Sequence, residues 1–145
     1  MMLEVEDIHT YYGTSHIIQG LSLEVGLNEI VCLIGRNGAG KTTTIRSIMG
    51  LTPPRRGEIR FKGKNIARIK PFSISRMGIG YVPEDRRIFP DLSVRDNLEI
   101  ARRSRVLTET GWNIKEIYDF FPKLKEIEDH RGSEMSGGEQ QMLAI

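Results

Sequence analysis

Residues 35–42 read Gly-Arg-Asn-Gly-Ala-Gly-Lys-Thr and fit the pattern G-x-x-x-x-G-K-[ST] of a loop that wraps around phosphate groups. The pattern carries this meaning only between a strand and a helix. The unbroken apolar run at residues 30–34 predicts a buried parallel strand before the loop. A helix is predicted after it, from about residue 40 to residue 49. The alternative is a glycine-rich turn that only leads into a helix.

Each residue type in this loop has a physical reason. Gly35, Gly38 and Gly40 let the backbone adopt positive φ, so that successive N–H groups can converge on an anion. The N-terminus of the predicted helix adds a partial positive charge at the same place. Lys41 is suited to the β and γ phosphates of a nucleotide, and the Thr42 hydroxyl is suited to Mg²⁺.

Length and composition describe a globular chain. It has 145 residues, of which 39% are hydrophobic, and its net charge of +2 is too small to require nucleic acid as a partner. The basic cluster at residues 102–105 is most simply a solvated helix face. The single cysteine, Cys32, lies in the apolar run, so a buried, inert thiol and a reducing cytosol are expected. No apolar run approaches the roughly 20 residues of a membrane helix, so membrane association is expected only through a partner.

The rest of the chain divides into an α/β part and a helical part. Alternating apolar and polar residues predict an N-terminal antiparallel layer from strands at residues 3–8 and 21–25. Further strands are predicted at residues 57–61 and 79–82, with a helix around residues 72–77 between them. We therefore divide the chain into an α/β core at residues 1–83 and a helical subdomain at residues 84–145.

Capping pairs mark the helices of the second part. Each pair places Ser or Asn three residues before an acidic residue and ahead of apolar positions; the pairs are Ser93 with Asp96, Asn113 with Glu116, and Ser136 with Glu139. The aromatic side chains are most simply the core of this subdomain; they are Trp112, Phe120 and Phe121.

A second motif, Met-Ser-Gly-Gly-Glu at residues 135–139, lies about a hundred residues after the first. With both motifs in place, the sequence resembles the nucleotide-binding subunit of an ABC transporter over essentially its whole length. Residues 35–43 match the Walker A motif, residues 81–84 the Q-loop and residues 135–139 the signature motif. Phrases at residues 9–13, 84–90 and 139–145 resemble the second ATPase of branched-chain amino-acid importers.

The resemblance implies a set of site residues. Tyr12 corresponds to the aromatic residue that stacks on adenine, with Tyr11 as its competitor, and Thr42 and Glu84 correspond to the Mg²⁺ ligands. Glu84 stands where the family usually has glutamine, and the alternative for it is a solvated loop carboxylate. The full nucleotide-binding set is Tyr12, Gly35, Arg36, Asn37, Gly38, Ala39, Gly40, Lys41, Thr42 and Thr43.

The signature residues are Ser136, Gly137, Gly138 and Glu139. In the family they meet the γ-phosphate of ATP held by the opposite subunit, so a second ATPase subunit is implied. The same residues form a capping box that any helix can use, and the two interpretations are compatible.

The implied fold is a P-loop NTPase (ABC ATPase) core with an N-terminal antiparallel layer, a helical subdomain and an incomplete central sheet. In the family, the Walker B aspartate, the catalytic glutamate and the switch histidine come after the signature helix. We therefore expect a C-terminally truncated chain without catalytic residues of its own.

The implied function is the ATP- and Mg²⁺-dependent subunit of a prokaryotic importer of branched-chain amino acids. It would lie peripherally at the cytoplasmic face of the inner membrane, bound to permease subunits and not to nucleic acid. The alternatives are a nucleotide-binding fragment without turnover and the ATPase of a urea or short-amide importer. An ABC ATPase that acts on nucleic acid is a distant third.

Overall fold

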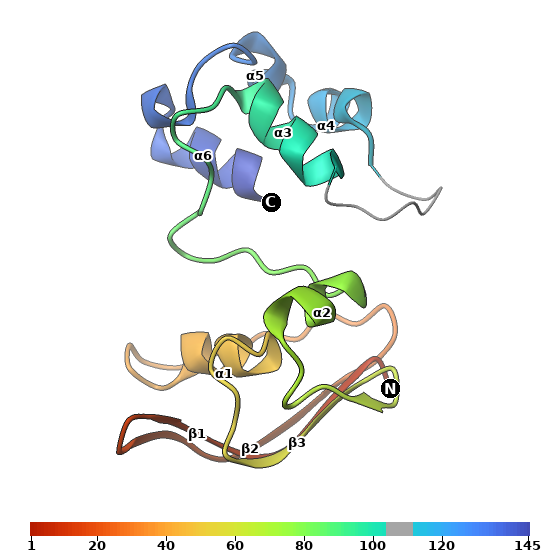
Figure 1. Ribbon diagram of the computed structural model, residues 1–145, viewed down its shortest axis with the longest axis vertical. Helices are drawn as coiled ribbons and strands as arrows, with labels where there is room; N and C mark the ends of the chain where they lie inside the picture. The colour runs from red at the N-terminus through yellow and green to blue at the C-terminus, as the bar shows by residue number, and fades with distance from the viewer. Residues whose placement is uncertain (104–111) are drawn as a thin grey trace. The chain divides into compact units, whose positions relative to one another are not determined.

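The computed structural model describes residues 1–103 and 112–145, and the chain forms two compact units, Met1–Tyr81 and Val82–Ile145 (Figure 1). Of the basic cluster at residues 102–105, the last two positions lie outside the described residues. Among the helices that are described, none has the length and apolar character that crossing a membrane requires.

The first unit is built on a four-stranded antiparallel sheet with the order β2-β1-β3-β4. β1 (Leu3–Tyr12) and β2 (Ser15–Val25) form a hairpin, and β3 (Arg56–Phe61) pairs with the other edge of β1. The short strand β4 (Lys64–Asn65) closes the sheet against β3. The predicted antiparallel layer is confirmed, with longer hairpin strands than the sequence pattern indicated.

Two helices, α1 (Lys41–Ile48) and α2 (Pro71–Arg76), lie over one face of this sheet (Figure 1). Both were predicted within one or two residues of their bounds. Pro71 begins α2 at a position where a missing N–H costs nothing. The buried apolar residues of the sheet and both helices form one core, made of Val5, Ile8, Ile18, Ile48, Met49, Ile59, Phe61, Ile66, Ala67 and Ile74.

The predicted parallel strands are wrong. Neither residues 30–34 nor residues 79–82 adopt strand structure. A parallel strand satisfies its backbone groups only through neighbouring strands, and the described residues provide no neighbour for either segment. Ile30 is therefore 97% exposed and Ile34 91% exposed. Cys32 is exposed as well, which corrects the prediction of a buried thiol.

The second unit consists of short helices around its own core. They are α3 (Val94–Arg103), α4 (Ile114–Phe120), α5 (Pro122–Glu126), the 3-10 helix η1 (Gly132–Glu134) and α6 (Gly137–Ala144). The core is formed by Val94, Leu98, Leu124, Ile127, Met135 and Leu143.

The three capping pairs are confirmed. The Ser93 hydroxyl accepts a hydrogen bond from the Asp96 N–H at 3.0 Å at the start of α3. Reciprocal capping boxes begin α4 and α6. The prediction that Trp112, Phe120 and Phe121 belong to the core of this subdomain is right only for Phe121, which packs against the core, whereas Trp112 and Phe120 are exposed. These two rings instead contact each other edge to face at 5.3 Å.

The exposed apolar segment predicts self-association. The 145-residue chain purified alone should aggregate, because the exposed apolar side chains of Ile30, Val31 and Ile34 favour association between molecules. Replacing Ile30 and Ile34 together by lysine should suppress the aggregation, measured by light scattering over a concentration series. Leu51→Lys is the matched control, since Leu51 is an exposed apolar residue outside the segment. A chain that stays monomeric without the substitutions contradicts this interpretation.

Candidate functional site

The loop at residues 35–40 is closed by its own lysine. Lys41 Nζ donates to the carbonyl oxygens of Gly35 at 2.8 Å and Arg36 at 2.9 Å. The Ala39 N–H donates to the Arg36 carbonyl at 3.1 Å, which makes the loop a tight turn. The lysine charge is therefore held over the loop, at the entrance to helix α1.

Two glycines in this loop have conformations that other residues avoid. Gly38 has φ +84° and Gly40 has φ +93°. A Cβ atom at Gly40 would come within 2.6 Å of Ile18 Cδ1, whereas a Cβ at Gly38 would meet nothing within 4 Å. The start of α1 thus lies close to Ile18 on β2, and Gly38 borders open space.

A buried pair of hydroxyl groups attaches α1 to the sheet. Thr10 Oγ1 on β1 lies 2.9 Å from Ser47 Oγ on α1. Ser47 Oγ donates to the Thr43 carbonyl at 2.8 Å, so its only proton is used and Thr10 must be the donor. Thr43, which was predicted to bind nucleotide, is buried near the start of α1. Its carbonyl accepts the hydrogen bond from Ser47.

The structure distinguishes the two tyrosines. The Tyr11 ring stacks on His16 at 4.1 Å and also has the Arg55 guanidinium 4.5 Å from its centroid. Tyr12 is 44% exposed, and Thr52 Oγ1 donates to its hydroxyl at 3.5 Å. This hydroxyl contact lowers the pKa of Tyr12. Tyr12 is thus the tyrosine of the two that is more available to a ligand. The contacts of Tyr11 with His16 and Arg55 could not be predicted from the sequence.

The two predicted metal ligands fall in different units. Thr42 is the second residue of α1 in the first unit, and Glu84 lies in a loop of the second unit. The neighbours of Glu84 have unusual backbones, since Arg86 has φ +58° and Arg87 φ +25°. Among residues 1–103 and 112–145, no three His, Cys, Asp or Glu side chains cluster in a way that could hold a metal ion.

The start of α6 is organised around Ser136. The Glu139 carboxylate accepts from the Ser136 N–H at 2.7 Å, and the Ser136 hydroxyl accepts from the Glu139 N–H at 3.4 Å. The Arg86 guanidinium lies over this start, with Nη1 3.0 Å from the position of a Cβ at Gly137. A Cβ at Gly138 would meet nothing within 4 Å. The helix start is therefore open at Gly138, whereas the Arg86 guanidinium covers it at Gly137.

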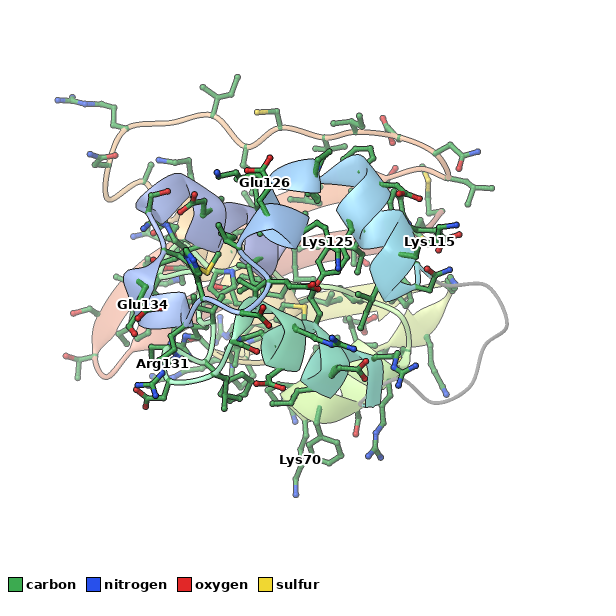
Figure 2. All side chains as sticks on the ribbon, turned by 90° about the horizontal axis from the view of Figure 1, so that it is seen from above. Lys70, Lys115, Lys125, Glu126, Arg131 and Glu134 are labelled. Atoms are coloured by element: carbon green, nitrogen blue, oxygen red, sulfur yellow. The ribbon has the colours of Figure 1, made fainter. Side chains whose placement is uncertain are left out.

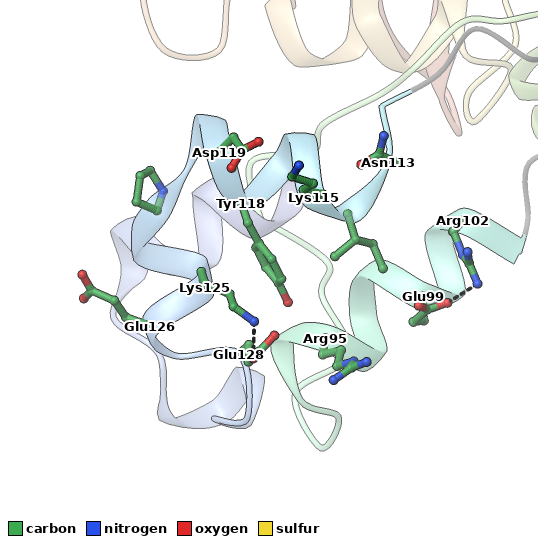
Figure 3. A pocket seen from close by; sticks show the side chains of 12 residues that line it. Arg95, Glu99, Arg102, Asn113, Lys115, Tyr118, Asp119, Lys125, Glu126 and Glu128 are labelled. Atoms are coloured by element: carbon green, nitrogen blue, oxygen red, sulfur yellow. Dashed lines mark hydrogen bonds and ion pairs between the residues drawn. The ribbon is translucent and has the colours of Figure 1, made fainter.

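A cavity of about 820 Å³ in the second unit had no signal in the sequence. Figure 3 shows Tyr118 pointing from α4 toward Glu128 and Arg95. Burial raises the pKa of Tyr118 to about 12, with the Glu128 carboxylate as the next cause. Two ion pairs lie in the lining of this cavity: Lys125 Nζ with Glu128 Oε1 at 2.5 Å, and Arg102 with Glu99 at 2.9 Å.

Comparison with known proteins identifies the family. Residues 18–145 match the family described as ABC transporter. The high-affinity branched-chain amino acid transport ATP-binding protein BraG of Pseudomonas aeruginosa is 39% identical over 144 residues, which cover 99% of this chain and 62% of that protein. The probable branched-chain amino acid transport ATP-binding protein LivF of Archaeoglobus fulgidus is 32% identical over 144 residues, which cover 99% of this chain and 61% of that protein.

A solved structure described as the ATP binding subunit of an ABC transporter has a TM-score of 0.81 and 30% identity, covering 99% of this chain and 60% of that one. The chain belongs to the family of ABC transporter ATP-binding domains. The resemblance drawn from residues 35–43 and 135–139 is thereby confirmed, as is the fold class. The chain spans about three fifths of the length of these relatives.

The capping box of α6 predicts a pH dependence. The hydrogen bond from the Ser136 backbone is the main cause that lowers the pKa of Glu139 below its ordinary value of 4.5. A lowered pKa contributes stability above the unfolded value and loses it as the pH falls through the folded value. The free energy of unfolding should therefore fall more between about pH 6 and pH 3 in the parent protein than in Glu139→Gln, which cannot titrate there. The free energy of unfolding is measured by denaturant titration at each pH. The same pH dependence in the parent protein and in Glu139→Gln would contradict the capping role.

Proposed function

We propose that this chain is the ATP-binding subunit of an importer of branched-chain amino acids and that it couples ATP binding and hydrolysis to uptake. The observation that carries the proposal is the loop at residues 35–40 with Lys41 folded over it. The names of the two relatives supply the solute class. Other matched relatives are named for sugars, lipopolysaccharide and iron, so the solute rests on similarity alone. A urea or short-amide importer is the alternative.

The loop has the chemistry of a phosphate site. Lys41 can exchange its bonds to the Gly35 and Arg36 carbonyls for bonds to phosphate oxygens, which are stronger acceptors because they are charged. The N-terminus of α1 adds a partial positive charge at the same place, which favours a bound anion. The residues that we assign to the nucleotide are Tyr12, Gly35, Arg36, Asn37, Gly38, Ala39, Gly40, Lys41, Thr42 and Thr43.

Thr42 and Glu84 are the residues that we assign to Mg²⁺. A hydroxyl and a carboxylate oxygen both suit this hard cation, which when bound neutralises charge on the β and γ phosphates. Glu84 adds a negative charge where the related proteins usually have a neutral amide. Compared with a glutamine at this position, Glu84 should therefore make Mg²⁺ binding more favourable and the approach of the γ-phosphate less favourable.

Two kinds of protein partner are part of the proposal. The start of α6, with Ser136, Gly137, Gly138 and Glu139, is assigned to the γ-phosphate of a nucleotide held by a second ATPase subunit. The segment that follows Glu84 and contains Phe89 is assigned to contact with a permease subunit. The Phe89 side chain is 53% exposed and is therefore available for such a contact. This arrangement would place the protein at the cytoplasmic face of the inner membrane, without nucleic acid.

Turnover depends on groups that we do not find in these 145 residues. No run of four apolar residues is followed by Asp-Glu, so the water-positioning carboxylate of an ABC ATPase has no counterpart here. Phosphoryl transfer relies on positioning and charge. We therefore propose that the 145-residue chain by itself binds nucleotide without turnover, whereas the whole protein hydrolyses ATP.

Lys41→Ala tests the phosphate loop. The variant should bind ATP about 1.5–3 kcal/mol more weakly, roughly 10- to 150-fold, because it loses a charge-assisted hydrogen bond. Lys64→Ala is the matched control, since it removes the same charge from the exposed strand β4. Isothermal titration with ATP and Mg²⁺ measures both. Equal affinity of the parent and Lys41→Ala would overturn the assignment.

The same variant tests the solute. In cells whose own gene carries Lys41→Ala, uptake of radiolabelled leucine, isoleucine and valine should fall to background while urea uptake is unchanged. Loss of urea uptake alone would favour the alternative importer.

Tyr12→Ala tests adenine stacking. The affinity for ATP should fall by about 1–3 kcal/mol, the range for bases stacked on aromatic side chains. Tyr11→Ala is the control and should leave the affinity unchanged, because its ring is already engaged by His16 and Arg55. The reverse pattern would assign adenine to Tyr11.

A further inference from the structure

The main chain of Phe89 is held by a buried asparagine. Asn97, on α3, is only 8% exposed. Its Oδ1 accepts from the Phe89 N–H at 2.8 Å, and its Nδ2 donates to the Phe89 carbonyl at 3.0 Å and to the Ser93 carbonyl at 2.9 Å. One side chain thus satisfies both backbone groups of Phe89. Removing it would take away the acceptor of the Phe89 N–H in a partly buried place, which is costly, whereas the Phe89 carbonyl would keep its bond from the Leu92 N–H at 3.3 Å.

Gly132 touches the same peptide from a distant part of the sequence. A Cβ at Gly132 would lie 2.9 Å from the Phe89 carbonyl oxygen and 2.9 Å from Ile88 Cδ1. The Gly132 N–H donates to the Leu92 carbonyl and the Ser133 N–H to the Pro90 carbonyl, both at 2.9 Å. The backbone of η1 therefore lies directly on residues 88–92, at a distance that only glycine permits.

The contact continues into the signature helix. Gln140 Nε2, on α6, donates to the Gly132 carbonyl at 2.9 Å. The Glu134 carboxylate accepts a hydrogen bond from the Arg131 N–H at 2.9 Å, which caps η1. Figure 2 shows the side chains of Arg131 and Glu134 at this turn. We call Asn97, Gly132 and the backbone of residues 88–92 the Phe89 clamp. It connects the segment after Glu84 to the helix that begins with Ser136–Glu139.

The clamp fixes the main chain of Phe89 while its ring is 53% exposed. An exposed ring on a rigid backbone is suited to an apolar contact with a partner. We propose that Asn97 and Gly132 are positioning residues that tie a partner contact at Phe89 to the placement of the signature residues. The proposal rests on the proposed function. Neither residue would touch nucleotide, so both act through the segments that they hold.

Hydrogen exchange tests the mechanical part. In the parent chain, the amides of residues 89–95, 129–133 and 137–141 should open as one cooperative unit. Asn97→Ala should accelerate exchange in all three segments by a similar factor, about 5-fold or more. Gly80→Ala is the control, because a Cβ there meets nothing within 4 Å. Acceleration confined to residues 89–95 would overturn the proposal.

Kinetics of the full-length protein test the functional part. Asn97→Ala and Gly132→Ala should each lower kcat about 5-fold or more, with ADP affinity at the phosphate loop unchanged. Adding Ile88→Val to Gly132→Ala should restore part of kcat, because it removes the Cδ1 atom that the new Cβ would meet. If Asn97→Ala does not fold, Asn97→Asp replaces it, since it keeps the acceptor for the Phe89 N–H and loses the donors.

The outcomes separate this inference from the proposed function. Normal kcat in the folded clamp variants, with ATP binding lost in Lys41→Ala, overturns the inference alone. Unchanged ATP binding in Lys41→Ala overturns the proposed function and with it the inference. A parallel loss of ADP affinity in the clamp variants would show general destabilisation and also count against a positioning role.

Discussion

The backbone at Gly40 is the constraint on which the loop at residues 35–40 depends, because its φ of +93° is a conformation that a residue with a Cβ adopts only with strain. Because Gly40 has no side chain, the start of α1 can lie directly against β2. The hydroxyl pair of Thr10 and Ser47 then holds the body of the helix to β1. With the helix fixed at both places, the loop before it has little freedom, and Lys41 closes it from within.

The second unit uses polar contacts for the same purpose. Its apolar core is small, and its helices are short enough that none would be stable alone. Capping boxes at α4 and α6 compensate for the exposed helix ends. The bonds from Asn97 and the close approach of Gly132 then join a loop to a helix start more than forty residues away. Specific positions are thus set by hydrogen bonds and by the absence of a Cβ, more than by the amount of apolar surface buried.

Much of the fold could be predicted from the sequence, and the failures share one cause. The hairpin, α1, α2 and the three caps depend on residues close together in the chain, and all are confirmed. The strand at residues 30–34 is wrong because an apolar run specifies a strand only where other strands pair with it. The prediction that Trp112 and Phe120 are buried failed for a similar reason. Hydrophobic character alone does not determine which aromatic ring reaches the core.

The sequence by itself determined the phosphate loop, the signature motif and hence the family, because each motif is a run of neighbouring residues whose spacing carries the chemistry. The tertiary structure alone decided that Tyr11 is occupied and Tyr12 exposed, that Lys41 rests on the loop carbonyls, and that Gly132 meets Phe89. These facts depend on atoms from distant parts of the chain. Only the folded backbone brings such atoms within hydrogen-bonding or van der Waals distance.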